Sequence, residues 1–386
     1  MAGDPLRVGV NLLWCLPGVV GGSEEYVERQ LLGLHAVAPE IDTTLYVVPG
    51  FAAAHPELAA CHELVVSSLD SRRRSRRVLY EATWLPPRLQ RVDVVHHAGG
   101  TVPPRSPRPV LLTIHDVQYR TFPQYHSPLK LQYLRIAVPH AVRAATVVAV
   151  PSEYVRGTVI DGFGIDPDRV VVVPHGVDTP ETFTPVEELR ERYGIGDRRY
   201  VVYPAITHPH KQHRFLLDLL AGPWSDPDLV LVLLGGRGRA EDDVAAAIAA
   251  LDLGPRVIRP GRVPAADRDG LIAGAEALVF PSEYEGFGAP VLEAMALGTP
   301  VVCSDRAALP EVAGDAALVR PLDQDAWAGV LDEIDREALA AAGRARAARF
   351  SVAASGAALA AAYRRCLEVV PRQVKRTRPS PETAGG

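Results

Sequence analysis

The sequence is poor in cysteine and has no long apolar run. Its 386 residues include four cysteines, no two of them spaced as CxxC: Cys15, Cys61, Cys303 and Cys366. This spacing argues against a disulfide framework or a zinc site and fits a reducing compartment such as the cytoplasm. No apolar run reaches the ~20 residues that cross a bilayer. The N-terminal stretch lacks a basic segment and is interrupted by Pro17, so it predicts a first strand and not a signal peptide.

A strong excess of one charge sign is also missing. The formal net charge is −5, with 47% hydrophobic and 23% charged residues. This balance is typical of a globular protein with a large core, and it gives the chain no general attraction to nucleic acid. At about 150 residues per domain, the length predicts two or three domains.

Short β-branched runs alternate with helical patterns in both halves of the chain. Most of these runs are apolar on both faces, which is typical of parallel strands covered by helices on both sides. We therefore predict two open, doubly wound α/β sheets, with strands at 7–13, 43–48, 92–97, 109–116, 145–152 and 170–176, then at 199–205, 229–236, 256–261, 276–282 and 300–305.

Composition places the domain boundaries. The segment 175–199 is rich in proline, threonine and charge and is predicted to connect domains at 1–180 and 181–350. After residue 306 the pattern is helical, and an Ala-rich helix is expected at 351–370. Residues 371–386 have no apolar period and are predicted to form a disordered tail.

Polar and glycine residues follow several of the predicted strands. Open α/β sheets bind ligands beyond the carboxyl ends of their strands, so two such sheets predict a site in the cleft between them. The residues at these ends are Gly21, Gly22, His115, Ser152, His175, Gly235, Gly236 and Glu285.

The stretch PSEYEGFGAPVLEAMAL places two carboxylates around a glycine-rich loop. Glu285 is predicted in the loop, and Glu293 about one turn into a helix that begins near Pro290. The glycines let the backbone approach a ligand, and the helix N-terminus favours an anion such as a diphosphate. The flanking carboxylates suit the hydroxyls of a nucleotide sugar. Taken alone, the same pair would instead be interpreted as a surface loop residue and a carboxylate that stabilises a helix end.

This stretch resembles the family 4 retaining glycosyltransferases, which have the GT-B fold. The resemblance implies two Rossmann-like domains facing across a cleft, with the C-terminal helix crossing back to the first domain. It extends, in the family's order, to NLLWCLPGVVGGSEEYVERQL (11–31), TIHDVQYRTFPQYHSP (113–128), VPSEYVRGTVIDGFGIDPDRVVVVPHGVD (150–178), YPAITHPHKQH (203–213) and RPGRVPAADRDGLIAGAEALVFPS (259–282).

The resemblance also implies roles around the loop. Glu285 is expected to contact the donor hexose, and Glu293 the ribose hydroxyls. The backbone of Phe287, Gly288 and Ala289 is expected to cradle the sugar and the distal phosphate.

Two more catalytic candidates lie on other segments. By resemblance, Lys211 binds the donor diphosphate and His115 lies at the active centre. The first glycine pair, Gly21 and Gly22, is expected to fold over the diphosphate. From the residues alone, Lys211 could equally be an exposed lysine at a helix start and His115 a turn residue.

One position departs from the family pattern. Many members carry an arginine five residues before the lysine, and here that residue is Ile206. Arg237 or Arg262 is the candidate replacement. The remaining expected donor contacts are Gly235, Gly236 and Val263.

The segment SRRRSRR (71–77) concentrates five arginines. It predicts either a solvated rim or, through Arg72–Arg77, a peripheral contact with an anionic membrane surface or a phosphorylated lipid-linked acceptor.

The resemblance implies a retaining transferase that moves a hexose to a hydroxyl of a saccharide or lipid-linked acceptor, and the similarity of YPAITHPHKQH (203–213) to bacterial mannosyltransferases implies GDP-mannose as the donor. No metal is expected, because no DxD-type pair follows a suitable strand, and no cofactor is expected beyond the nucleotide sugar. The expected location is the cytoplasm, at the inner face of the membrane. The alternatives are a UDP-sugar donor, a sugar-nucleotide epimerase of the same fold, or a non-catalytic two-lobed binding protein.

Overall fold

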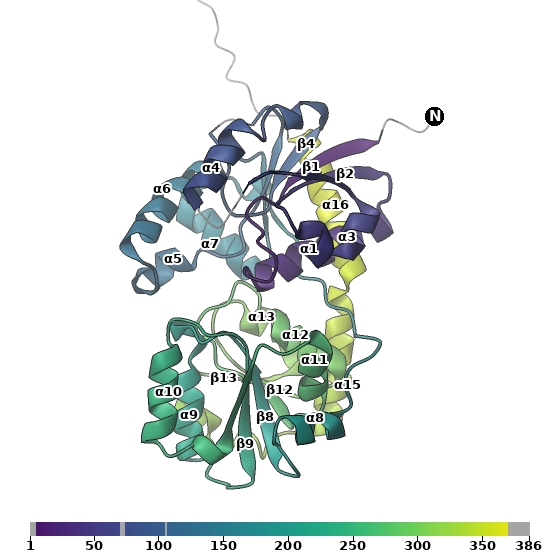
Figure 1. Ribbon diagram of the computed structural model, residues 1–386. Coiled ribbons are helices and arrows are strands. Elements are labelled where there is room, and N and C mark those ends of the chain that lie inside the picture. The colour runs from purple at the N-terminus through teal and green to yellow at the C-terminus, as the bar shows by residue number, and fades with distance from the viewer. Residues whose placement is uncertain (1–4, 70–73, 105, 370–386) are drawn as a thin grey trace, which may run out of the picture.

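The computed structural model describes residues 5–69, 74–104 and 106–369 (Figure 1). The predicted tail at 371–386 lies outside the described residues, as do Arg72 and Arg73 of the arginine-rich segment. Two α/β domains lie one above the other, each built on a sheet in which every pair of neighbouring strands is parallel.

The first sheet has the strand order β3-β2-β1-β4-β5-β6-β7. Its central strands carry Val and Leu side chains that are buried on both faces, as strands between two layers of helices must be. The bounds are β1 Leu6–Asn11, β2 Ile41–Val47, β3 Glu63–Val66, β4 Val94–His97, β5 Val110–Thr113, β6 Val147–Val150 and β7 Val170–Val172. The helices are α1 Gly22–Val37, α2 Phe51–Ala54, α3 Pro56–Cys61, α4 Arg74–Thr83, α5 Gln118–Thr121, α6 Pro128–Ala144 and α7 Glu153–Phe163.

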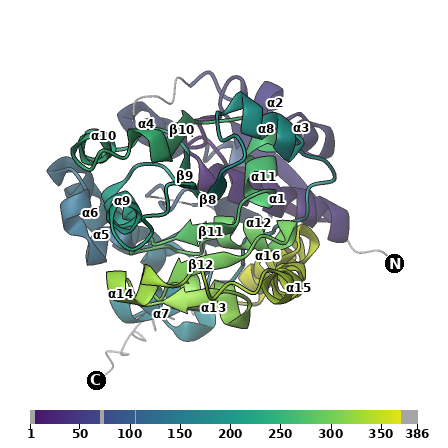
Figure 2. The same ribbon diagram turned by 90° about the horizontal axis from the view of Figure 1, so that it is seen from below.

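The second sheet has the order β10-β9-β8-β11-β12-β13. Figure 2 shows α9 and α10 on one side of it and α11 and α12 on the other. The strands are β8 Arg199–Pro204, β9 Leu229–Leu234, β10 Val257–Gly261, β11 Ala277–Phe280, β12 Val301–Ser304 and β13 Leu318–Arg320. The helices are α8 Val186–Arg192, α9 His213–Ala221, α10 Glu241–Ala250, α11 Ala265–Ala273, α12 Ala289–Leu297, α13 Leu309–Ala313, α14 Gln324–Ala328 and α15 Arg336–Ala347.

The last described helix, α16 (Val352–Glu368), follows α15 of the second domain and packs on α1 of the first. Gly33 and Gly356 permit this close approach, because a Cβ on Gly33 would lie 2.1 Å from the carbonyl oxygen of Val352. Tyr363 also hydrogen-bonds His96 Nδ1 at 2.9 Å. The predicted fold class is therefore confirmed, including the returning helix.

The strand predictions were incomplete at the sheet edges. Every predicted run overlaps a strand, but β3 and β13 were missed, and the prediction of helix alone after residue 306 was wrong at β13. Both strands lie at an edge and are short and only partly buried, so they lack the apolar runs of the central strands.

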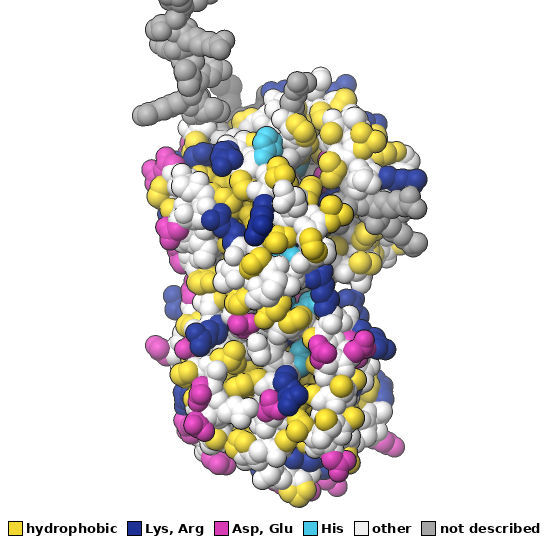
Figure 3. All heavy atoms as spheres, turned by 90° about the vertical axis from the view of Figure 1, so that its left-hand side faces the viewer, with side chains coloured by type: hydrophobic (Ala, Val, Ile, Leu, Met, Phe, Trp, Pro, Cys, Tyr) yellow, Lys and Arg dark blue, Asp and Glu magenta, His cyan; other side chains and the backbone are white. Residues whose placement is uncertain are grey.

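The two domains meet through specific contacts along their boundary. Ser152 Oγ donates to the carbonyl of Gly286 at 2.7 Å. The hydroxyl of Tyr125 donates to Glu283 at 3.1 Å, and Arg239 donates to the Tyr125 carbonyl. On the side of the molecule shown in Figure 3, the surface narrows at this boundary and histidine side chains are exposed along it. The two domains are therefore held together by polar bonds on several elements.

Among the described residues, no helix is both long and apolar enough to span a bilayer.

Candidate functional site

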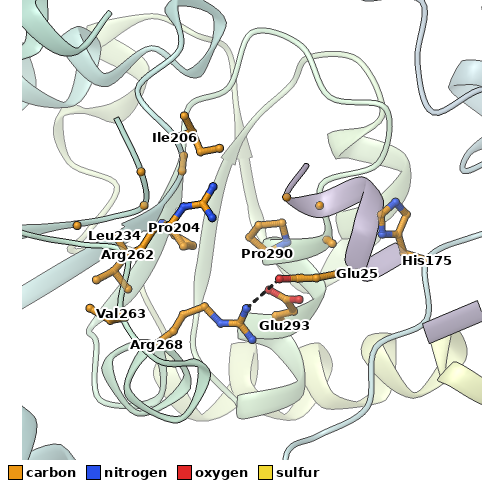
Figure 4. A pocket seen from close by; sticks show the side chains of 17 residues that line it. Glu25, His175, Pro204, Ile206, Leu234, Arg262, Val263, Arg268, Pro290 and Glu293 are labelled. Carbon is orange, nitrogen blue, oxygen red and sulfur yellow. Dashed lines mark ion pairs between the residues drawn. The ribbon is translucent and has the colours of Figure 1, made fainter. Parts of the chain in front are cut away.

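A pocket of about 330 Å³ lies between the two domains at the carboxyl ends of their strands (Figure 4). Its lining combines backbone from glycine-rich loops with charged side chains and a few apolar ones. From the first domain and the connection it takes Gly21, Gly22, Glu25 and His175; from the second it takes Pro204, Ala205, Ile206, Leu234, Gly235, Gly236, Gly261, Arg262, Val263, Arg268, Ala289, Pro290 and Glu293.

Helix α12 directs its N-terminus at this pocket. Gly288 precedes the helix with φ of 97°, a left-handed conformation that favours glycine. A Cβ there would also lie 2.6 Å from Leu309. Ala289 and Pro290 line the pocket, so the free N–H groups and the positive end of the helix dipole face it. This arrangement can bind an anion, as the sequence predicted.

Gly286 is also needed for packing between the domains. A Cβ at this position would lie 2.2 Å from the carbonyl oxygen of His115. The loop of the second domain therefore packs directly on the end of β5 in the first domain. This contact fixes the loop against the segment that carries His115.

Lys211 and Glu285 form an ion pair. Lys211 ends a short 3-10 turn after β8, and its Nζ lies 2.5 Å from Glu285 Oε1. Their side chains are 18% and 14% exposed, and Nζ also lies 5.5 Å from the ring centre of Phe280. Neither residue lines the pocket, but each lies on a loop with a residue that does. Lys211 follows Ile206 on the loop after β8, and Glu285 precedes Ala289 on the loop before α12. Two of the catalytic candidates are thus brought together.

His115 is a neutral imidazole in this structure. Its Nε2 lies 2.9 Å from the carbonyl oxygen of Ala98, so this nitrogen carries the proton. Burial lowers the pKa of His115. The ring packs against those of Trp14 and Tyr26, with centroids 5.9 and 5.3 Å away. The side chain is therefore held in one orientation next to the Gly286 loop.

Phe287 and His175 form a stack across the domain boundary. Their ring centroids are 4.7 Å apart at an interplanar angle of 12°, and the ring centroid of Tyr26 lies 4.2 Å from that of His175. Burial lowers the pKa of His175 well below its usual value, so the ring is neutral. His175 lines the pocket, whereas the Phe287 side chain is buried against it and leaves only its backbone for a ligand.

Arg262, and not Arg237, reaches the pocket in place of an arginine at Ile206. Arg262 lies over Gly236, with Nε 2.9 Å from the Cβ position of that glycine, and donates to the Gly18 carbonyl at 2.7 Å. The Arg237 side chain is 81% exposed and lies 3.7 Å from Glu241 of α10. The structure therefore does not bring Arg237 to the site. Arg262 also ties the glycine-rich loop of the first domain to the second domain.

Sequence reasoning missed three charged residues at the Glu293 end of the pocket. Arg29 of α1 donates to Glu293 Oε1 at 2.8 Å, and Arg268 of α11 lies 3.7 Å from Glu25 of α1. Burial, with the nearby Glu293 carboxylate adding to it, raises the pKa of Glu25. The only signal in the sequence was the spacing of Glu25 and Arg29, which puts them on one face of a helix just after Gly21–Gly22.

The arginine-rich segment is described only in part. Arg76 is exposed on α4, and Arg77 lies 3.8 Å from Glu81.

Within the described ranges, no group of three His, Cys, Asp or Glu side chains is placed to hold a metal ion.

Comparison with known proteins identifies this arrangement. The model of "Glycosyltransferase Family 4" matches residues 20–181, and that of "Glycosyl transferases group 1" matches residues 185–347. The O-antigen chain mannosyltransferase B of Escherichia coli is 32% identical over 271 residues, 67% of this chain and 71% of the relative. A D-inositol 3-phosphate glycosyltransferase of Kineococcus radiotolerans is 30% identical over 262 residues, 60% of each chain.

A solved structure shows the same fold. The crystal structure of Anabaena Alr3699/HepE in complex with UDP and glucose superposes with a TM-score of 0.72 at 21% identity, covering 92% of this chain and 98% of that one. Two parallel Rossmann-like domains with a pocket between them have the GT-B arrangement. The chain belongs to glycosyltransferase family 4 and is similar to bacterial mannosyltransferases of that family.

Proposed function

We propose that the protein is a metal-independent, retaining mannosyltransferase that uses GDP-mannose and glycosylates a hydroxyl of a saccharide or lipid-linked acceptor. The observation that carries the proposal is the Lys211–Glu285 pair, 2.5 Å apart on the loops beside the α12 N-terminus. The mannosyl donor is supported by the O-antigen mannosyltransferase relative.

The pocket and the loops beside it offer a place for each part of a nucleoside diphosphate sugar. The diphosphate would lie at the N-terminus of α12, where amide hydrogens, Arg262 and Lys211 offset its charge. The nucleoside would occupy the space between Gly235 and α12, with Glu293 accepting hydrogen bonds from ribose. The hexose would then lie toward Glu285 and His115.

The proposed reaction is a front-face displacement. The bond between the anomeric carbon and the donor phosphate oxygen breaks, and a bond from that carbon to the acceptor oxygen forms on the same face. The acceptor proton goes to the leaving phosphate. Lys211 and the α12 N-terminus stabilise the negative charge that develops on this phosphate, which is the task that a metal ion performs in other transferases. Glu285 holds the hexose, and neutral His115 orients it.

The D-inositol 3-phosphate glycosyltransferases among the relatives supply a second acceptor class, a small phosphorylated polyol. UDP-hexose is the second donor class. For location, we propose the cytoplasm at the inner face of the membrane, with Arg76 as the described part of a basic contact. Co-sedimentation with anionic and neutral vesicles tests this contact.

A thermal-shift panel of GDP, UDP, ADP and TDP tests the donor. A ligand at 100 times its dissociation constant adds about 2.7 kcal/mol to stability. We expect the largest shift with GDP, and a larger shift with UDP overturns the GDP assignment.

Incubation with GDP-mannose, acceptor and EDTA, followed by NMR of the product, tests the anomeric configuration and the need for metal. Conversion of UDP-N-acetylglucosamine without acceptor would instead identify an epimerase.

A further inference from the structure

Helix α1 of the first domain carries two charged side chains, one turn apart, at this end of the site: Glu25 lines the pocket, and Arg29 contacts Glu293, which lines it. Arg29 Nη2 donates to Glu293 Oε1 at 2.8 Å, and Glu25 Oε1 lies 3.7 Å from Arg268 Nη1. Figure 4 shows Glu25, Arg268 and Glu293 converging at one end of the pocket that all three line. This end of the site is therefore built by both domains.

The Arg29–Glu293 pair is buried enough to fix the carboxylate. The side chains are 23% and 9% exposed. A carboxylate this buried is stable only when it is paired and hydrogen-bonded. The guanidinium occupies Oε1, and an ionised carboxylate has further lone pairs on Oε2. Glu293 can therefore be held by Arg29 and still accept a hydrogen bond from a ligand in the pocket.

We propose that Arg29 is a positioning residue for the ribose site. It holds Glu293 in the orientation that accepts a ribose hydroxyl, so the nucleotide site is completed across the domain boundary. This inference rests on the proposed function, because it takes the ligand to be a nucleoside diphosphate. The ribose is then the part of the donor whose binding depends on contact between the two domains.

Titration calorimetry with nucleotides that differ only in the ribose tests the proposal. The wild-type protein, Arg29→Ala, Arg29→Lys and Glu293→Ala are titrated with GDP and 2′,3′-dideoxy-GDP, and with the matching UDP pair. We expect the wild-type protein to prefer the ribonucleotide by about 10- to 100-fold, since the analogue leaves a buried acceptor unpaired. Arg29→Ala should lose most of this preference while its affinity for the dideoxy analogue stays unchanged. Arg29→Lys should recover part of it.

Two further variants separate positioning from a structural effect. Adding Arg29→Ala to Glu293→Ala should cause no further loss, because the two residues act as one unit. Arg364→Ala is the matched control. It removes an arginine that is 52% exposed and pairs with Glu40 at 2.5 Å, between α16 and the end of α1. It should bind all four nucleotides as the wild-type protein does.

The outcomes are distinct. If Arg29→Ala loses the same affinity for the ribonucleotide and for the dideoxynucleotide, Arg29 only holds the two domains together, and the proposal is overturned. A full ribose preference in Arg29→Ala, with that preference lost in Glu293→Ala, would overturn this inference and leave the proposed function standing. If the wild-type protein binds no nucleoside diphosphate, the proposed function and this inference fail together.

Discussion

Lys211 and Glu285 each have two roles, one toward each other and one toward the donor in the proposed reaction. In the absence of a ligand each residue neutralises the other in a setting where both are less than one-fifth exposed. In the proposed reaction Lys211 must also meet the leaving phosphate and Glu285 the hexose. Lysine suits this double role because its ammonium carries three donors on a flexible stem. Substitution of either residue should therefore affect both turnover and stability.

Replacing Lys211 with alanine is expected to lower kcat by about 10²- to 10³-fold, because it removes a cation from the developing charge. It should also lower the free energy of unfolding by about 1–3 kcal/mol, since Glu285 loses its partner. Glu285→Ala should show the same two effects. Steady-state kinetics and urea denaturation measure them. Arg214→Ala, which removes an arginine 62% exposed on the adjacent α9, is the control and should keep both values. Wild-type turnover in either test variant would refute its proposed role.

The sequence predicted the site residues that lie on family motifs, and it missed the charged residues that contact them from the other domain. Glu285, Glu293 and Lys211 follow strands at readable positions, and the structure brings each to the pocket or to the loops beside it. Arg29 was missed because its partner is 264 positions away. From the sequence, Glu25 and Arg29 have the spacing of a surface helix pair. Only the approach of the two domains gives them other partners.

At the scale of one element, β4 places two histidines in the centre of the first sheet. His96 and His97 have no exposed surface. His96 lies 2.9 Å from the Tyr363 hydroxyl of α16 and 2.8 Å from Thr113 of β5, and His97 lies 3.1 Å from Asn11 of β1. Burial lowers the pKa of both rings to about 3. Both are therefore neutral in the folded protein over the physiological range.

Because these two buried histidines are neutral in the folded protein, we expect acid to destabilise the fold. The unfolded chain binds protons at these rings below pH ~6.5, and the folded protein does not. The free energy of unfolding is therefore unaffected by these rings above pH ~6.5. It decreases as the pH falls toward ~3, by up to about 1.4 kcal/mol for each pH unit and each histidine. Urea denaturation at pH 7 and pH 5.5 measures the loss, which should be smaller in His97→Asn. His140→Asn, at an exposed position on α6, should keep the wild-type loss. Equal losses in all three proteins would contradict the prediction.

The elements were predictable where burial is complete on both faces. Strands such as β5 (VLLT), β6 (VVAV) and β9 (LVLVLL) are runs of mostly Val and Leu, so their positions could be read from the chain. β3 and β13 contain ELVV and LVR and are only partly covered, so their sequences carry too little apolar signal. Their existence depends on pairing with β2 and β12, which no local pattern encodes.

At the scale of the whole molecule, one carboxylate of the second domain caps a helix of the first. Glu311 on α13 accepts the backbone N–H of Glu153 at 2.8 Å and that of Tyr154 at 2.9 Å, at the N-terminus of α7. Ser152 caps the same helix from within and donates to the Gly286 carbonyl. A negative charge is most stabilising at this end of a helix. The contact therefore favours the state in which the domains are together.

Removing this cap should let the domains separate. Each charge-assisted bond is worth about 1.5–3 kcal/mol, so Glu311→Ala should shift the equilibrium toward an open form by at least ~10-fold. We expect a larger radius of gyration by small-angle X-ray scattering and weaker donor binding. Glu153→Ala is the matched control, because it removes a carboxylate 66% exposed at the same helix end and keeps the backbone N–H that Glu311 binds. Scattering from Glu311→Ala that matches both the control and the wild-type protein would show that the domains stay together without this cap.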